Sequence, residues 1–389
     1  MTDGVAGPIY LDYNATAPLR PEALNATMDA LHSVGNASSI HNPGRDAAAR
    51  VDTARLQLSE LLGCSPGEIV FTSGATEANN LALRAAAAQN GTVVVAATEH
   101  PAVLETARAV TYSSPDSLLV LPVTSEGRLE LGPLQEAVGT RDVAVVSAMI
   151  ANNETGVLTD LETLIGIAHE AGALVHTDAT QYVGRLPLDL HELDVDLLSL
   201  SAHKFGGPQG VGALFVRRGT RLPHRPLLIG GGHERGWRAG TLNVPGIAGL
   251  GAAAHAASRN MEEDTARVGK LRDLLEAELL ARIPGCRING ASAPRLPGVS
   301  SITIPGAPAD AVLAAMPQVA ASDGSACAAG APSPSHVLLA MGLSREDADA
   351  TMRFSLGYAT TEQDVHEASA ATVRAAAHVR SAMSAQPES

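Results

Sequence analysis

Apolar residues along this chain follow two alternating patterns. Stretches with apolar positions at helical spacing predict helices over residues 50–62, 77–88, 101–110, 131–138 and 161–171. Short runs rich in β-branched residues predict strands over residues 68–72, 92–96, 117–121, 143–149, 173–176, 196–200 and 211–216. This alternation predicts an α/β fold with a mostly parallel sheet that helices cover on both faces. Ligands of such sheets bind beyond the carboxyl ends of the strands.

The pattern changes near Gly230. Residues 229–251 are rich in glycine and poorly periodic, which predicts a long functional loop. A long helix follows, whose apolar face leaves Lys270 in solvent. Beyond it we predict strands over 287–289, 299–304 and 351–355 and helices over 310–316, 335–341 and 362–383. These elements predict a smaller α+β domain.

The length of 389 residues is enough for two domains. We expect a large domain over residues 15–258 and a small C-terminal domain over residues 259–389. The N-terminal segment 1–14 is expected to pack with the small domain.

Bulk composition narrows the class of protein. A formal net charge of −14 argues against a nucleic-acid-binding surface. The chain has no apolar run long enough to span a membrane, and its N-terminus lacks the pattern of a signal peptide. Cys64, Cys286 and Cys327 have neither paired nor metal-ligand spacing, which fits free thiols in a reducing compartment. We therefore expect a cytoplasmic protein without a metal site.

Lysine occurs only at Lys204 and Lys270. Lys204 follows a predicted strand and lies beside His203. The glycines and the proline after it predict a sharp turn with little bulk around the amine. If the protein forms a covalent bond through an amine, Lys204 is the candidate.

Polar residues also follow several other predicted strands. In FTSGATEANN a strand leads into a helix, where Ser73 and Thr76 suit the N-cap region and free N–H groups can hold a phosphate. Taken alone, that turn is better explained as an ordinary capped helix. His100, residues 152–154 and Asp178 follow three more strands, and a lone histidine at a strand end is more often structural than catalytic. Their shared position predicts that they converge on one site.

Cys327 lies in ASDGSACAAGAPSPSH, a run of small residues that predicts a loop with nothing to bury the sulfur. Cysteines usually lie in cores, so this setting favours a reactive thiol. Residues 63–67 match the nucleophile-elbow pattern, but they connect a helix to a strand, the reverse of the order that this motif requires. The chain has no H-E-x-x-H and no Walker-A sequence.

An ordered set of motifs resembles those of the cysteine desulfurases, the NifS/IscS-like group of the class V aminotransferase family. These motifs are YLDYNATAPL, FTSGATEANN, TEHPAV, NNETGV, HTDATQ, SAHKFGGPQGVGAL, GGGHERGWRAGT, GSAC and MRFSLG. The resemblance extends over nearly the whole chain. It implies a PLP-dependent transferase of fold type I, with a mostly parallel, seven-stranded sheet in the large domain.

The resemblance also implies a cofactor, pyridoxal 5′-phosphate, bound covalently through Lys204. Asp178 would pair with the pyridine nitrogen, and His100 would stack on the ring and carry protons. The residues implied to hold the phosphate are Ala75, Thr76, Ser201, His203 and, from the second subunit of a homodimer, Thr241. The residues implied to bind the ring hydroxyl and its surroundings are Gln181 and Asn153. The residues implied to bind the substrate are Arg353, which would clamp its carboxylate, with Asn14 and Asn153.

The implied reaction converts L-cysteine to L-alanine and leaves the sulfur as a persulfide on Cys327 for an acceptor protein. Iron–sulfur assembly, tRNA thiolation and DNA phosphorothioation are the pathways that this group supplies. The coding bias towards arginine and alanine keeps DNA phosphorothioation among them, and the acidic charge predicts that a partner protein contacts the DNA.

Two alternatives stay open at the level of the sequence. An aminotransferase, a selenocysteine lyase or a related lyase of the same fold would need Lys204 and Asp178 but not Cys327. A sulfur-relay scaffold, acting by docking, would not need Lys204.

Overall fold

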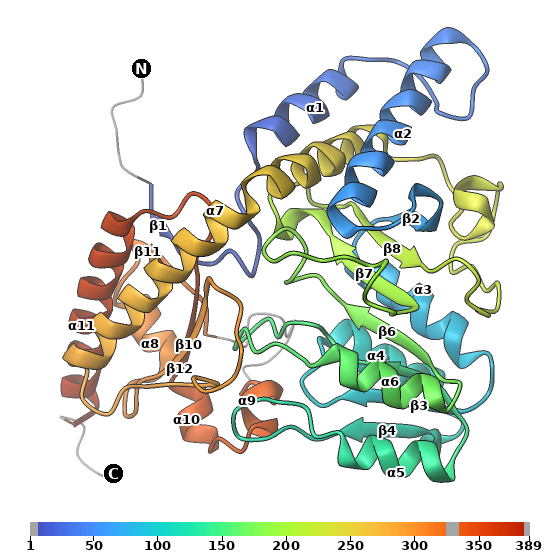
Figure 1. Cartoon of the computed structure of the whole chain (residues 1–389). Helices are drawn as coiled ribbons and strands as arrows, with labels where there is room; N and C mark the ends of the chain where they lie inside the picture. Colours follow the sequence, from blue (N-terminus) through green and yellow to red (C-terminus); the bar gives the residue numbers. More distant parts are fainter. Residues whose placement is uncertain (1–6, 324–333, 385–389) are drawn as a thin grey trace.

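The computed structural model describes residues 7–323 and 334–384 (Figure 1). Its largest sheet has seven strands in the order β2-β8-β7-β6-β5-β3-β4. Their bounds are β2 (Ile69–Thr72), β3 (Thr92–Ala96), β4 (Leu118–Leu121), β5 (Val143–Ser147), β6 (Leu174–Asp178), β7 (Leu197–Ser201) and β8 (Gly212–Val216). β8 is antiparallel to both of its neighbours, and every other neighbouring pair is parallel. The predicted mostly parallel sheet is therefore confirmed.

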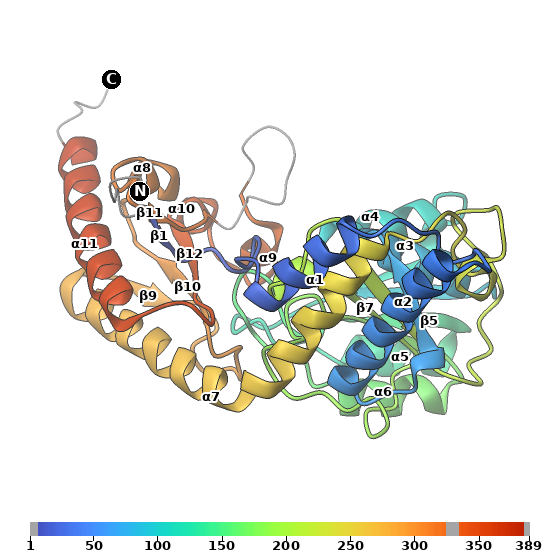
Figure 2. The same cartoon turned by 90° about the horizontal axis from the view of Figure 1, so that it is seen from above.

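Helices cover both faces of this sheet. The first half of α7 (Val244–Arg282) packs on one face together with α2 (Asn42–Leu62), α5 (Gly132–Thr140) and α6 (Leu161–Glu170). The other face is covered by α3 (Ala75–Ala87) and α4 (Pro101–Val110), and Figure 2 shows these two helices across the sheet from α5 and α6. β3, β5, β6 and β7 are buried along their whole length, which explains their continuous apolar runs in the sequence.

A second hydrophobic core lies in the C-terminal part of the chain. There β12 (Thr351–Ser355), β10 (Val299–Thr303) and β9 (Arg287–Ile288) form an antiparallel sheet in that order. The second half of α7 and α11 (Glu362–Ser384) pack on it through residues such as Leu275, Ile302 and Phe354. The shorter helices of this region are α8 (Ala309–Ala314), α9 (His336–Ala340) and α10 (Arg345–Asp349).

The N-terminal segment joins this second core before the chain enters the large sheet. β1 (Ile9–Tyr10) pairs in parallel with β11 (Val319–Ala320), and Asp12 forms a bridge with Ser355. The domain boundaries at residues 14 and 258 stay predictions. Residue 258 lies inside α7, which is continuous between the two cores.

The predicted loop over residues 229–251 is wrong in its last third, because α7 begins at Val244. The glycines there serve close packing. A Cβ at Gly251 would lie 2.4 Å from the Cα of Ala54 in α2, and a Cβ at Gly249 would lie 2.3 Å from Oγ1 of Thr27 in α1 (Pro21–Leu31). Glycine richness here therefore marks an interface between helices.

Four elements had no counterpart in the sequence prediction. In α1 only Ala23 and Ala30 are buried, so the helix lacks a wide apolar face. β1, β11 and α10 are too short to produce a periodic pattern. Across the part of the chain that the structure describes, no helix combines the length and the apolar character needed to cross a bilayer.

We expect Gly251→Ala to lower the free energy of unfolding by about 1–3 kcal/mol, because the added methyl group would overlap the α2 backbone. Gly269→Ala, in the same helix, is the matched control. Its Cβ would lie 3.8 Å from the Cβ of Pro297, so the better helix propensity of alanine is expected to raise the stability by up to about 1 kcal/mol. Urea unfolding of both variants tests this difference, and equal stabilisation by both would contradict the packing described for α7.

Candidate active site

A cavity of about 350 Å³ lies beyond the carboxyl ends of the large sheet. Its walls come from the segments that follow β2, β3, β5, β6 and β7, and from the N-terminal segment at Asn14. The sequence-predicted residues that line it are Asn14, Ala75, Thr76, His100, Asn153, Asp178, Gln181, Ser201, His203 and Lys204. The expectation that the strand ends converge on one site is confirmed.

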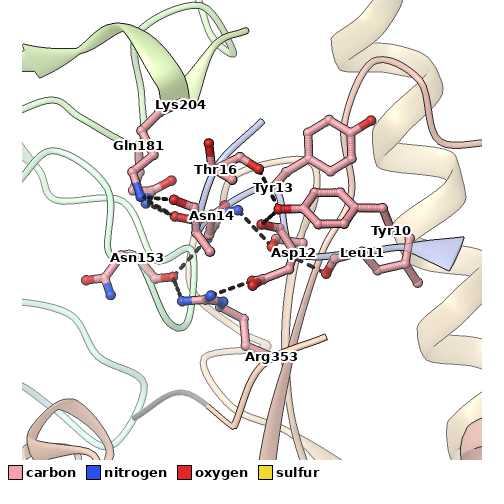
Figure 3. A network of polar contacts seen from close by, with 12 residues as sticks. Tyr10, Leu11, Asp12, Tyr13, Asn14, Thr16, Asn153, Gln181, Lys204 and Arg353 are labelled. Carbon is pink, nitrogen blue, oxygen red and sulfur yellow. Dashed lines mark hydrogen bonds and ion pairs between the residues drawn. The ribbon is translucent and has the colours of Figure 1, made fainter. Parts of the chain in front are cut away.

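Lys204 lies in a single tight turn, Ala202–Lys204, directly after β7. Its Nζ donates hydrogen bonds to the carbonyl oxygens of Asn14 and Ala15, at 2.8 Å for Ala15 (Figure 3). Gly206 has a φ of +91°, and a Cβ there would lie 2.6 Å from Cγ of Arg20. The turn that presents the amine therefore requires glycine at this position.

Asp178 ends β6 and is 5% exposed. Its Oδ2 accepts a hydrogen bond from Nδ2 of Asn79 at 2.7 Å, and its Oδ1 accepts one from the backbone N–H of Thr180 at 2.9 Å. These donors fix the orientation of the carboxylate at the cavity wall. Asn79 was not among the residues that the sequence motifs predicted for the site. Its signal was an amide in a buried position of α3, next to the buried Ala78 and Ala82.

His100 is the N-cap of α4, and its Nδ1 accepts a hydrogen bond from the backbone N–H of Ala102 at 3.0 Å. Burial lowers its pKa, Asp178 opposes this and Lys204 adds to it. His100 therefore has both of the roles that the sequence left open, because it caps α4 and also lines the cavity. Because Nδ1 accepts, the neutral ring carries its proton on Nε2.

The N-terminus of α3 faces the cavity, and Ser73 and Thr76 lie in its N-cap region as predicted, but neither side chain caps the helix. The N-cap is Gly74, and no side chain caps the helix. Glu77 instead binds the backbone N–H of Ser73 at 2.8 Å and Nε of Arg238 at 3.0 Å. Burial opposes ionisation of Glu77, yet these bonds lower its pKa. Thr72 accepts from the backbone N–H of Gly74, so the N–H groups that no described side chain bonds at this wall of the cavity are those of Ala75 and Thr76.

His203 and Ser201 lie on the opposite side of the same end of the cavity. Nδ1 of His203 is 3.1 Å from Oγ1 of Thr16. Burial and the nearby Lys204 lower the pKa of His203 to about 4, so the ring is neutral at pH 7. A Cβ at Gly74 would lie 3.6 Å from Oγ of Ser201, which shows how closely the two sides approach.

Several buried polar atoms of the cavity wall lack a partner among the described residues. They are Oγ1 of Thr180, Oε1 of Gln181 and Oδ1 of Asn79. Nε2 of Gln181 binds the carbonyl oxygen of Asn14 at 3.0 Å, so its remaining amide oxygen is an available acceptor. Unsatisfied groups of this kind are typical of a site that a ligand completes.

Arg353 lies beneath the cavity and is not part of its wall. Its guanidinium binds Oδ1 of Asp12 at 2.6 Å and the carbonyl oxygen of Asn153 at 3.2 Å (Figure 3). Asn14 binds the same carbonyl oxygen through Nδ2 at 2.8 Å. The charge of Arg353, which the resemblance implies would bind the substrate carboxylate, is therefore already paired with Asp12. Nε of Arg353 is buried without a partner among the described residues.

Of two further predicted residues, the structure describes only one, and that one is not brought to the cavity. Thr241 is exposed just before α7 and is not part of the cavity wall. Cys327 lies outside the described residues. Cys64 and Cys286 are free thiols, and burial raises the pKa of Cys64 to about 12 and that of Cys286 to about 11.

Glu154, beside Asn153, is buried and accepts a hydrogen bond from Oγ of Ser335. Burial raises the pKa of Glu154 to about 7. The bond from Ser335 and the charge of Arg353 oppose this rise, and Asp323 adds to it. The sequence analysis named residues 152–154 together but did not predict this contact, because Ser335 is far away in the chain.

Comparisons with known proteins agree with this geometry. The chain matches the model of a family described as aminotransferase class-V over residues 9–367. It is 44% identical over 364 residues to a cysteine desulfurase of Gluconacetobacter diazotrophicus, with 92% of this chain and 90% of the relative covered.

Two solved structures are also similar. A NifS-like protein from Rickettsia africae has a TM-score of 0.86 at 31% identity, with 96% of this chain and 99% of that one covered. A structure described as SspA in complex with cysteine has a TM-score of 0.78 at 31% identity, with 90% and 98% covered. These likenesses confirm the predicted fold class.

The buried Glu154 predicts a pH-dependent stability. Its pKa is about 7 when folded against 4.5 as the ordinary value, so only the unfolded chain loses this proton between those values. The stability that the neutral carboxyl contributes is thus present below pH 4.5 and is lost as the pH rises through 7. Relative to the wild type, Glu154→Gln is expected to gain stability from pH 5 to pH 8, by at most about 3 kcal/mol.

Urea unfolding of both proteins at pH 5 and pH 8 measures this gain. Glu126→Gln is the control. Hydrogen bonds from Ser292 lower the pKa of Glu126, so this carboxyl is ionised in both the folded and the unfolded chain above pH 5, and the stability of that variant relative to the wild type is expected to stay nearly constant from pH 5 to pH 8. A pH-independent difference between Glu154→Gln and the wild type would show that Glu154 does not titrate in this range.

Proposed function

The chain belongs to the aminotransferase class-V family and is a pyridoxal 5′-phosphate-dependent cysteine desulfurase, and we propose that it converts L-cysteine to L-alanine with transfer of the sulfur to Cys327. The observation that carries the proposal is that one cavity holds Lys204, Asp178 and His100. An amine, a carboxylate and a neutral imidazole are the groups that this cofactor and its proton transfers require.

The cavity fits pyridoxal phosphate in two respects. The cluster of partnerless polar atoms at Thr180, Gln181 and Asn79 provides acceptors and donors where a polar ring would lie. The uncapped N-terminus of α3 at Gly74, facing Ser201, suits the phosphate, because backbone N–H groups and the helix dipole favour an anion there.

We assign the contacts of the cofactor on this basis. Lys204 would hold it covalently, Asp178 would pair with the pyridine nitrogen, and Gln181 and Asn153 would bind the ring hydroxyl and its surroundings. The phosphate would be held by Ala75, Thr76, Ser201, His203 and the partner subunit's Thr241. When bound, pyridoxal phosphate supplies an electron sink that weakens bonds at the neighbouring carbons of the substrate.

The residues of the chain orient the substrate and move its protons. Asn79 and Thr180 hold the Asp178 carboxylate in place. His100, whose Nδ1 is engaged by α4, has Nε2 available to exchange a proton. Arg353 would bind the substrate carboxylate with Asn14 and Asn153. Because Asp12 is already paired with Arg353, the substrate would have to share or displace that carboxylate.

The sulfur step is a nucleophilic attack by the Cys327 thiolate on the sulfur of the substrate. The new S–S bond forms as the C–S bond breaks, and the carbon keeps the electron pair and takes a proton to become alanine. A sulfur-acceptor protein then receives the sulfur from the persulfide. A cytoplasmic location, where thiols stay reduced, is part of the proposal.

The test is mass spectrometry of the protein after addition of L-cysteine. We expect a gain of one sulfur on Cys327 and release of alanine, with both lost in Cys327→Ser although the visible absorbance of the bound cofactor is kept. Lys204→Ala is the control and should lose that absorbance. An aminotransferase would keep its turnover in Cys327→Ser, and a sulfur-relay scaffold would support its pathway with Lys204→Ala. Either result would refute the proposal.

The second partner that we propose is another copy of the chain. An exposed apolar surface follows from α1 into the next loop, and it consists of Leu24, Met28, Leu31, Val34 and Ile40. Val34 is 85% exposed and Ile40 is 88% exposed, and such exposure of several large apolar residues in one segment is typical of an interaction surface. A homodimer would cover this surface and would also bring the partner subunit's Thr241 to the cavity.

We expect the wild type to be a dimer by light scattering and the double variant Leu31→Glu, Ile40→Glu to be a monomer, because two buried carboxylates would oppose association. Leu280→Glu, on an exposed position of α7, is the matched control and should stay a dimer. A double variant that is still dimeric would show that the apolar surface of α1 lies outside the interface.

A further inference from the structure

The described residues stop at Asp323 and resume at residue 334. Residues on both sides of this gap are linked by hydrogen bonds to the turn that contains Asn153 and Glu154. On the first side, Ser322 and Arg353 exchange backbone hydrogen bonds of 3.1 and 2.7 Å. Arg353 in turn donates to the carbonyl oxygen of Asn153 at 3.2 Å. This side of the chain is therefore two contacts away from Asn153, a residue of the cavity wall.

On the second side, Ser335 is the N-cap of α9. Its Oγ accepts from the backbone N–H of Leu338 at 3.1 Å and donates to Oε2 of Glu154. The next residue, His336, lies 2.9 Å through Nε2 from the carbonyl oxygen of Glu99. The start of α9 is thus attached to the segments that follow β3 and β5, next to His100 and Asn153.

The turn that receives these contacts is rigid. Oδ1 of Asn152 accepts from the backbone N–H groups of Glu154 and Thr155, each at 2.9 Å. Nδ2 of Asn152 donates to the carbonyl oxygen of Thr98 at 3.1 Å. These bonds hold the backbone that carries the Glu154 side chain beside the cavity. The side-chain hydrogen bond described for the Glu154 carboxyl comes from Ser335, at the start of α9.

Burial of this contact opposes ionisation of Glu154. Glu154 is buried, and the charged groups that act on it are Arg353, which favours its ionised form, and Asp323, which opposes it. A glutamine would offer an amide oxygen to Ser335 in place of the carboxyl oxygen, without a buried ionisable group. What matters at position 154 is therefore a side-chain oxygen that accepts the hydrogen bond from Ser335. Removal of that oxygen would detach the start of α9 from this turn.

We propose that Glu154 is a positioning residue of the desulfurase reaction. Through Ser335 it holds the start of α9 against the Asn153 turn, and so fixes the point beside the cavity at which the described chain resumes after the segment that contains Cys327. The proposal rests on the function proposed above. It predicts that sulfur transfer depends on the Glu154–Ser335 hydrogen bond although neither residue contacts cofactor or substrate.

The test is single-turnover formation of the Cys327 persulfide by the cofactor-loaded protein after mixing with L-cysteine. Ser335→Ala and Glu154→Ala are expected to slow it by about tenfold to a hundredfold, since small misplacements of a reacting group cost that much. The KM for L-cysteine and the cofactor absorbance should stay unchanged. The two effects should not add in the double variant, because both remove one interaction. Glu154→Gln should restore the rate, since its amide oxygen can accept from Ser335.

Ser344→Ala is the matched control. Ser344 caps α10 by accepting from the backbone N–H of Asp347 at 3.1 Å and is exposed, so the variant loses a helix cap without touching Glu154. It should form persulfide at the wild-type rate. Wild-type rates in Ser335→Ala, or loss of cofactor absorbance together with the rate, would overturn the positioning role. If the wild type itself formed no persulfide on Cys327, the proposed function would fail instead.

Discussion

The site depends on one constraint, the common direction of six strands of the large sheet. Because only β8 runs the other way, the segments that follow β2, β3, β5, β6 and β7 all leave the sheet at the same edge. Residues far apart in the chain, such as His100 and Lys204, meet there without any dedicated contact between their own elements. The register of β6 and β7 places Asp178 opposite Ser199. The carboxylate therefore lies next to the end of β7, from which the turn with Lys204 begins. Reversal of any one of these strands would remove its residue from the cavity.

The pattern of apolar residues predicted this part of the structure well, since a strand buried on both faces has a strong signal. The bounds of β3 and α4 agree with the prediction residue for residue, and the lysine, the carboxylate and the histidine lie where strand ends predicted them. What failed was what tertiary contacts decide. Gly249 and Gly251 were predicted to lie in a loop although they are in a helix that packs closely on its neighbours. Asn79 and Ser335 carry hydrogen bonds to residues far away in the chain, and no local pattern encodes such a partner.

The buried polar residues around the cavity differ in whether other residues satisfy their hydrogen bonds. His176, beneath Asp178, is enclosed between the hydroxyl groups of Ser147 and Ser199, and burial lowers its pKa to about 4, so it is a neutral and fully bonded support. Thr180 and Gln181 instead keep buried oxygen atoms that no described residue satisfies. The fold thus supplies both partners of His176 and leaves the oxygen atoms of Thr180 and Gln181 to a ligand, which would add the missing hydrogen bonds to the stability of the protein.

The unbroken course of α7 has a mechanical consequence. Its first half is packed under the large sheet and its second half under the C-terminal sheet, with no proline between Ala252 and Arg282. An enzyme that closes on its substrate often does so about a flexible hinge, but here such a pivot would have to bend a hydrogen-bonded rod. Opening and closing of the space between the two cores would therefore require elastic bending of α7, which opposes the displacement, rather than rotation about a flexible hinge.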